Sequence, residues 1–194
     1  MAKAFEGVRI VDFTQVLCGP MATAQMALLG ADVIKIEIPE IGDQMRMLSA
    51  RDIWAETRCG PGFMGVNYGK RSLSLDLKAP EAKEIVGRLV KGANAIAENF
   101  KPGVLNRLGF SYDWAKSIQP DIVYIAISGF GQEGPRRDQP ATDSVMQAYT
   151  GMMSINRDIN GLPQRINMLA IDFSTGLYAF QAASAALYGQ AVKG

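Results

Sequence analysis

A strand, a helix and a second strand follow one another closely near the start of the chain, and this order constrains the fold more than any other feature. Val8–Phe13 is rich in β-branched and apolar residues, which predicts a strand. Gly19-Pro20 ends that strand, Met21–Leu29 holds good helix formers up to Gly30, and Asp32–Glu37 predicts a second strand. A unit of this length implies a right-handed crossover between parallel strands.

The rest of the chain continues this alternation. We expect strands over 71–77, 95–98, 121–128 and 166–171, and helices over 80–90, around Arg107, over 112–118 and 142–153, and from the residues after Asp172 to Val192. Segment 129–135 predicts a loop, Asn160-Gly161 a tight turn, and Thr142 or Asp143 a helix cap. The pattern predicts one α/β domain, a Rossmann-like, mostly parallel sheet flanked by helices.

Two loops of the predicted sheet bear on ligand binding. The turn 15–20 holds one glycine, so it lacks the G-x-G-x-x-G turn of a dinucleotide site, and a nicotinamide dehydrogenase is disfavoured. That turn still lies at the carboxyl end of a strand, where open α/β sheets bind ligands. Segment 38–69 shows little periodicity, and a loop of that length is uncommon unless it serves a function or a partner stabilises it.

Asp172 stands between the predicted strand 166–171 and an alanine-rich helix. A carboxylate at such a junction is commonly a helix N-cap that accepts backbone N–H groups. It can also be a nucleophile at a strand end that substrates reach. Ser174 and Thr175 could cap the helix themselves, which would leave Asp172 free for chemistry.

The composition excludes several classes of site. The chain has no histidine, which removes Ser-His-Asp and Cys-His nucleophiles, histidine metal sites and the usual general base near neutral pH. No metal is therefore expected, and the net charge of +1 suggests neither nucleic acid nor a membrane surface as partner. No window is long and apolar enough for a transmembrane helix, and the first seven residues lack the apolar region of a signal peptide. Cys18 and Cys59 have no metal-like spacing, so we expect a reduced cytoplasmic protein.

Several short motifs follow one another in order from about residue 5 to the end of the chain. They are Gly7–Thr14 with Gly19-Pro20, Leu29–Glu37, Lys70–Ser72, Leu75–Lys78, Glu98–Phe100 with Pro102-Gly103, Leu105–Gly109 and Ser128–Gly131. Each motif is weak alone. Together they resemble the N-terminal half of the class III CoA-transferases, or CaiB/BaiF family, which includes formyl-CoA transferase and carnitine CoA-transferase.

The resemblance implies a catalytic role for Asp172, because the family's catalytic aspartate follows a short apolar strand and precedes a small-residue helix. It implies that CoA moves between carboxylic acids through an aspartyl mixed anhydride and an enzyme–CoA thioester. The related α-methylacyl-CoA racemases pair this aspartate with a histidine whose position is Thr142 here. Threonine cannot act as that base, so a racemase is disfavoured.

The resemblance also implies the CoA site, with CoA or acyl-CoA as substrate and no permanently bound cofactor. It places Val16, Leu17 and Cys18 near CoA, and assigns the adenosine and phosphates to Leu75, Lys78, Asn99, Phe100, Lys101 and Arg107. Basic side chains suit phosphate, although solvated surface charges are the alternative for Lys78, Lys101 and Arg107. The alternative for Cys18 is a small buried hydrophobe. The residue after Glu37, often arginine in the family, is Ile38 here, so adenine packing must differ.

Members of the family are roughly twice this length, with a second, smaller domain and a C-terminal return that completes the large domain. The resemblance therefore makes residues 1–194 the N-terminal part of the large domain. Two subunits interlock in the family, so we expect a homodimer or a partner chain that supplies the missing half. The rival hypothesis is a non-catalytic CoA-binding or assembly half-subunit.

Overall fold

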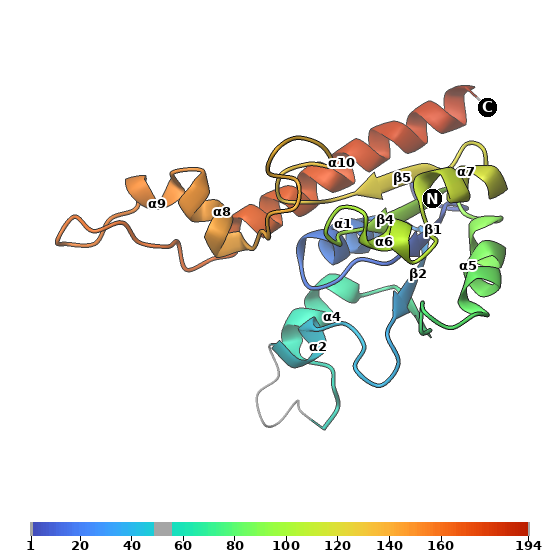
Figure 1. Cartoon of the computed structure of the whole chain (residues 1–194), viewed down its shortest axis with the longest axis horizontal. Coiled ribbons are helices and arrows are strands. Elements are labelled where there is room, and N and C mark those ends of the chain that lie inside the picture. The colour runs from blue at the N-terminus through green and yellow to red at the C-terminus, as the bar shows by residue number, and fades with distance from the viewer. Residues whose placement is uncertain (1, 49–55, 194) are drawn as a thin grey trace.

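The computed structural model describes residues 2–48 and 56–193, and a five-stranded parallel sheet lies at its centre (Figure 1). The strands are β1 (Arg9–Asp12), β2 (Asp32–Glu37), β3 (Arg71–Ser74), β4 (Ala95–Glu98) and β5 (Val123–Ala126), in the order β3-β2-β1-β4-β5. The predicted α/β class and parallel sheet are confirmed. Because the winding reverses between β1 and β4, the carboxyl ends of these two strands form a topological switch point.

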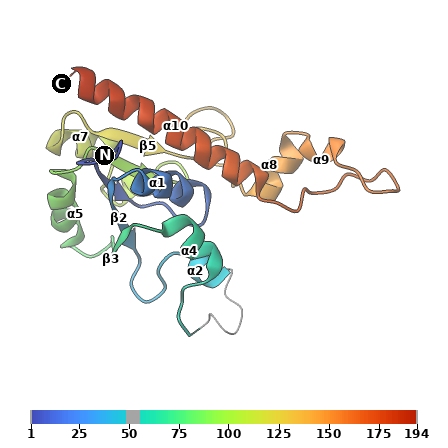
Figure 2. The ribbon, with the colours of Figure 1, turned by 180° about the vertical axis from the view of Figure 1, so that it is seen from behind.

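Helices cover both faces of the sheet. They are α1 (Cys18–Leu28), α2 (Met45–Leu48), α4 (Pro61–Asn67), α5 (Ala82–Val90), α6 (Val104–Arg107), α7 (Tyr112–Ile118), α8 (Asp143–Tyr149), α9 (Met152–Ile155) and α10 (Ala170–Lys193). Side chains alternate across a strand, so Val11 and Ile96 pack with α5, α6 and α7, while Ile10 and Ala95 pack with α1 and α10 on the opposite face. Figure 2 shows α1 and α10 lying over the sheet from that side.

Two boundaries near the N-terminus differ from the prediction. Helix α1 begins at Cys18 rather than Met21, so Gly19 and Pro20 belong to its first turn. Proline is tolerated there because a first-turn N–H has no intrahelical acceptor. The predicted loop 38–69 contains the short helices α2 and α4, which pack with Leu17 in a small apolar cluster, while its residues 49–55 lie outside the described part.

The predicted strand 166–171 is wrong. Its side chains are exposed or half-buried, and it lies beside no strand of the sheet. The fully buried Gln147 takes up its backbone groups instead. The Gln147 Nε2 donates to the carbonyls of Ile166 (3.3 Å) and Met168 (3.0 Å), and the Ile166 N–H donates to the Gln147 Oε1 (2.9 Å). An irregular segment held by one side chain therefore leads into α10.

Residues 150–168 and the helices α8 and α9 form an arm that projects beyond the end of the sheet (Figures 1 and 2). The predicted helix 142–153 divides into α8 and α9 at Gly151, which has a φ of +81°. The predicted turn at Asn160-Gly161 is confirmed, and the Gly161 N–H donates to the Asp158 carbonyl (3.0 Å). The arm exposes large apolar side chains, including Ile155, Ile159 and Leu162. Within residues 2–48 and 56–193, no helix combines the length and hydropathy needed to cross a membrane.

Candidate functional site

Two cavities lie where the parallel strands end, and Asp172 lines one of them. This cavity, of about 320 Å³, is here called the Asp172 cavity. Its walls come from the β1–α1 turn, the loops after β4 and β5, and the first turns of α8 and α10. The lining residues are Gln15, Val16, Leu17, Cys18, Asn99, Ile127, Ser128, Gly129, Ala141, Thr142, Met146, Ile171, Asp172 and Thr175. The cavity therefore lies at the switch point between β1 and β4.

Asp172 is the third residue of α10 rather than its N-cap. Ser174 does not cap the helix either, because it lies inside α10 and its hydroxyl donates to the Ala170 carbonyl (2.7 Å). The cap comes from another helix, since the buried Asp143 Oδ2 accepts the N–H groups of Ile171 (2.8 Å) and Asp172 (3.1 Å). Thr142 occupies the N-cap position of α8, as predicted, but its side chain makes no capping hydrogen bond, and Asp143 is the first residue of that helix. Asp143 instead fixes the first turn of α10.

The surroundings of Asp172 shift the acidity of the two reactive groups in this cavity. Burial, with the neighbouring Asp143 carboxylate, raises the pKa of Asp172. Its position in the first turn of α10 acts in the other direction, because the positive end of a helix favours a carboxylate. Burial, with the nearby Asp172 charge, raises the pKa of the half-buried Cys18 thiol. Burial and the Asp172 charge thus disfavour the Cys18 thiolate, the form in which a cysteine acts as a nucleophile.

Helix α10 crosses α1 closely at Gly176, one turn after Asp172. A Cβ at Gly176 would lie 2.8 Å from the Cys18 carbonyl oxygen and 3.2 Å from the Met21 side chain. Only glycine allows this separation between backbones. The close crossing brings Asp172 beside Cys18 in the same cavity.

The β1–α1 turn is held to β4 by one side-chain amide. The Asn99 Oδ1 accepts the Gln15 N–H (2.7 Å), and the Asn99 Nδ2 donates to the Gln15 carbonyl (2.8 Å). Behind the turn, the buried Lys70 Nζ lies 3.0 Å from the Asp12 Oδ2 and donates to the Pro20 carbonyl (2.9 Å). Burial lowers the pKa of Lys70 to about 8, although Asp12 opposes that shift. The turn therefore rests on polar contacts from several elements.

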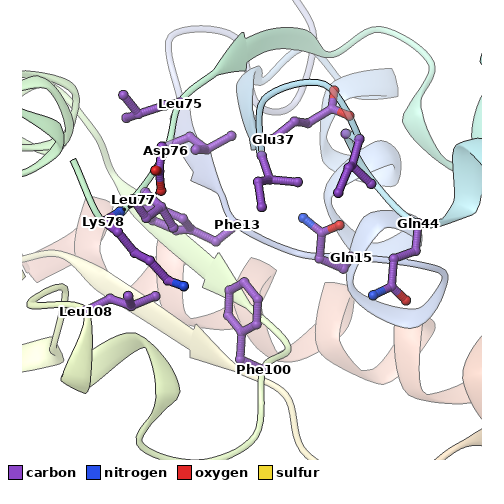
Figure 3. A pocket seen from close by; sticks show the side chains of 14 residues that line it. Phe13, Gln15, Glu37, Gln44, Leu75, Asp76, Leu77, Lys78, Phe100 and Leu108 are labelled. Carbon is purple, nitrogen blue, oxygen red and sulfur yellow. Dashed lines mark hydrogen bonds between the residues drawn. The ribbon is translucent and has the colours of Figure 1, made fainter.

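The second cavity, of about 300 Å³, lies on the other side of Gln15 and is here called the Lys78 cavity (Figure 3). Its lining residues are Phe13, Gln15, Ile36, Glu37, Ile38, Ile41, Gly42, Gln44, Leu75, Asp76, Leu77, Lys78, Phe100 and Leu108. The Phe100 N–H donates to the Glu98 Oε2 (2.8 Å), and burial raises the pKa of Glu98 to about 7. Since Gln15 lines both cavities, the two adjoin.

The structure divides the predicted CoA residues into three groups. Val16, Leu17, Cys18 and Asn99 line the Asp172 cavity, and Leu75, Lys78 and Phe100 line the Lys78 cavity. Cys18 thus faces a cavity rather than serving as a fully buried hydrophobe. Lys101 and Arg107 are exposed and line neither of these two cavities. Arg71, also outside both cavities, forms an ion pair in which its guanidinium lies 2.7 Å from the Asp32 carboxylate.

Sequence reasoning missed three side chains that hold the segments around Asp172 and the β1–α1 turn. Asp143 was expected to cap its own helix, and Gln147 carried no signal. Lys35 did carry one, because a lysine inside the apolar run Val33–Ile36 is seldom buried without a partner. Among residues 2–48 and 56–193, no group of three His, Cys, Asp or Glu side chains is placed to hold a metal ion.

Comparison with known proteins gives a consistent result. A family model described as CoA-transferase family III matches residues 5–194. Human succinyl-CoA:glutarate CoA-transferase is 37% identical over 95% of this chain and 42% of its own length. Formyl-CoA:oxalate CoA-transferase of Rhodopseudomonas palustris is 40% identical over all of this chain and 45% of its own length.

Solved structures agree with the sequence comparisons. The crystal structure of a CAIB/BAIF family protein from Brucella suis is 35% identical, with a TM-score of 0.92, and covers 100% of this chain and 51% of its own. The chain thus spans about half the length of the relatives that it matches.

Proposed function

The chain belongs to CoA-transferase family III, and we propose that it transfers CoA between carboxylic acids with Asp172 as the nucleophile. The observation that carries the proposal is the Asp172 carboxylate, which lines a cavity at the switch point and whose helix turn is fixed by Asp143. A held carboxylate without a histidine partner suits nucleophilic attack, because the carboxylate needs no base to activate it.

The proposed reaction proceeds in four acyl-transfer steps. The Asp172 carboxylate attacks the thioester carbonyl of an acyl-CoA, which forms a mixed anhydride and releases the CoA thiolate. The thiolate attacks the aspartyl carbonyl, which forms an enzyme–CoA thioester and releases the first carboxylate. A second carboxylate attacks that thioester and again expels the thiolate. The thiolate then attacks the new acyl carbonyl, which releases the new CoA ester and restores Asp172. The thioester's free energy is thus conserved.

We propose that the two adjoining cavities hold different parts of an acyl-CoA. We assign the thioester and acyl group to the Asp172 cavity, beside Cys18 and Asn99, and the adenosine to the Lys78 cavity. In the latter, the Phe100 ring offers a stacking surface and Lys78 a positive charge for phosphate (Figure 3). Backbone N–H groups of the glycine-containing loop at Ser128-Gly129 are candidates for stabilising the oxyanions.

The names of the relatives suggest the substrate class. The human relative is named for succinyl-CoA and glutarate, and the Rhodopseudomonas relative for formyl-CoA and oxalate. We therefore propose short carboxylic acids and their CoA esters as substrates. An α-methylacyl-CoA racemase is disfavoured, because Thr142 lines the cavity where a proton-transfer base would be needed.

A second candidate follows from the arm. The arm exposes apolar side chains such as Ile159. Exposed apolar surface of this kind favours association with a further copy or a partner chain. The alternative is therefore a non-catalytic CoA-binding or assembly half-subunit that needs a partner chain.

Intact-protein mass spectrometry after incubation with succinyl-, formyl- and acetyl-CoA tests the proposal. We expect a hydroxylamine-sensitive CoA adduct on the wild-type chain and none on Asp172→Asn, which preserves the shape of the side chain but not its nucleophilicity. Cys18→Ser is the matched control and should keep the adduct. Measurable CoA binding without an adduct from any donor would favour the half-subunit. An adduct that persists in Asp172→Asn would refute Asp172 as the nucleophile.

A further inference from the structure

Three consecutive backbone positions before α1 are held by side chains from other parts of the chain. The Thr14 carbonyl accepts from the Lys35 Nζ (2.6 Å), and Asn99 holds both backbone groups of Gln15. The Val16 N–H donates to the Asp43 Oδ1 (3.0 Å). No regular secondary structure pairs these groups, so the side chains determine the path of the turn.

Val16 is the residue that needs this support. Its φ is +68°, in the left-handed region that β-branched residues rarely adopt. That conformation is strained and persists only where the surroundings over-determine it. Val16 also lines the Asp172 cavity, so its strained conformation shapes the cavity wall.

Asp43 connects this turn to the Lys78 cavity. Its side chain is fully buried, and its Oδ1 also accepts the Met45 N–H (2.8 Å). Its own N–H donates to the Glu37 Oε2 (2.9 Å), and the residues on either side of it line the Lys78 cavity. The Asp43 carboxylate therefore fixes the position of Val16, in the wall of the Asp172 cavity, relative to the wall of the Lys78 cavity.

The charge of Asp43 is balanced by a lysine that is itself buried. The Lys35 Nζ lies 2.8 Å from the Asp43 Oδ2, and both side chains are at most 1% exposed. Buried ion pairs contribute little net stability compared with apolar residues of similar volume. Global stability is thus a poor explanation for this pair, whereas both members contact the turn directly.

We infer that Asp43 is a positioning residue, which, neutralised by Lys35, holds Val16 in the conformation that shapes the Asp172 cavity for CoA. The inference rests on the proposed function for its ligand. It assigns Asp43 no contact with CoA and no part in bond making. The turn is held from one side by Asn99 and from the other by Asp43.

The test compares two double variants of the full chain. Lys35→Met with Asp43→Asn removes both charges and keeps an oxygen acceptor for Val16, while Lys35→Met with Asp43→Ala removes the acceptor as well. Neither leaves an unpaired buried charge. We expect the alanine variant to bind CoA roughly tenfold more weakly than the asparagine variant, the effect of losing the Val16 hydrogen bond at ordinary net strength. The Met45 N–H loses its acceptor in the same variant, but Met45 does not line the Asp172 cavity. Titration calorimetry with CoA measures this difference.

Amide hydrogen exchange at Val16 gives a readout that does not require CoA. We expect faster exchange at Val16 in the alanine variant than in the asparagine variant. Arg71→Met is the control, because it removes the Arg71–Asp32 ion pair without touching the β1–α1 turn, and it should leave the Val16 amide protected.

Equal CoA affinity and equal Val16 exchange in the two double variants would overturn the inference. A wild-type protein that binds no CoA would instead refute the proposed function, and the exchange comparison would still decide the role of Asp43. If the alanine variant does not fold, Lys35→Met with Asp43→Asn is compared with the wild type instead, because it keeps the same hydrogen bond without an unpaired buried charge. Asparagine must then keep Val16 protected, and loss of that protection would count against the inference.

Discussion

Gly176→Ala tests whether the close crossing of α1 and α10 sets the position of Asp172. The added Cβ would lie 2.8 Å from the Cys18 carbonyl oxygen, whereas carbon–oxygen contacts are seldom closer than about 3.3 Å. The helices must therefore separate by about 0.5 Å, the difference between these two distances. Overpacking of this kind costs about 1–3 kcal/mol, against a gain of about 1 kcal/mol in helix propensity.

Gly189→Ala in the same helix is the matched control. No atom lies within 4 Å of the Cβ that alanine would add there, so the propensity gain is unopposed and the variant should be stabilised by up to about 1 kcal/mol. The difference between the two variants isolates the contact at Gly176. For a chain of this size we expect the melting temperature of Gly176→Ala to lie between about 2 and 12 °C below that of Gly189→Ala.

The same two variants connect packing with the proposed chemistry. A displacement of about 0.5 Å at α10 should slow formation of the CoA adduct at Asp172 by about tenfold, since misplacement by 1 Å can cost about a hundredfold. Gly189→Ala should form the adduct at the wild-type rate. Thermal melts followed by circular dichroism and adduct mass spectrometry supply the two measurements. If Gly176→Ala melts as high as Gly189→Ala, the crossing yields without cost and the reasoning is refuted.

Three further predictions concern the charged groups around the site. Asp143→Asn should keep an oxygen for the α10 cap but remove a charge that raises the pKa of Asp172. The acid limb of the pH profile of adduct formation should therefore move to lower pH, and an unmoved limb would contradict this. Burial raises the pKa of Glu98 from 4.5 to about 7, so the folded state disfavours the charged carboxylate. The resulting loss of stability is zero below pH 4.5 and reaches its full size above about pH 7. The melting temperature of Glu98→Gln relative to wild type should therefore rise between these pH values, and a constant difference would show that Glu98 is not buried in this way. Lys70→Met leaves the buried Asp12 without its closest cation, so the urea midpoint should fall by the equivalent of about 3–5 kcal/mol of unfolding free energy, as for other broken buried pairs. A loss of stability below about 1 kcal/mol would instead be typical of an exposed pair.

The sheet could be predicted from the sequence because its strands satisfy local rules. Val8–Phe13 and Asp32–Glu37 combine β-branched residues with flanking turn signals, and each contains the observed strand β1 or β2. The apolar segment 166–171 satisfies similar rules but has no neighbouring strand, and Gln147 takes its hydrogen bonds instead. Local propensity describes a strand's side chains, whereas a strand exists only where another strand pairs with it.

The site was only partly accessible to sequence reasoning for the same physical reason. Asp172 could be singled out from the resemblance, but its supports, Asp143 and Gly176, act through contacts between distant segments. The capping of α10 by a carboxylate from α8 spans 28 residues and follows no short-range motif. Asp43 and Lys35 show a similar limit, because a lysine in an apolar strand signals a buried partner without identifying it.

The borrowed cap at the start of α10 has a consequence for isolated peptides. A peptide of residues 164–194 would contain Asp172 and all of α10, but neither Asp143 nor the α1 surface that receives Gly176. Its first turn would fray in water, as uncapped helix ends do. Asp172 would then titrate like an aspartate in a random coil, and the residue could be present without its reactivity.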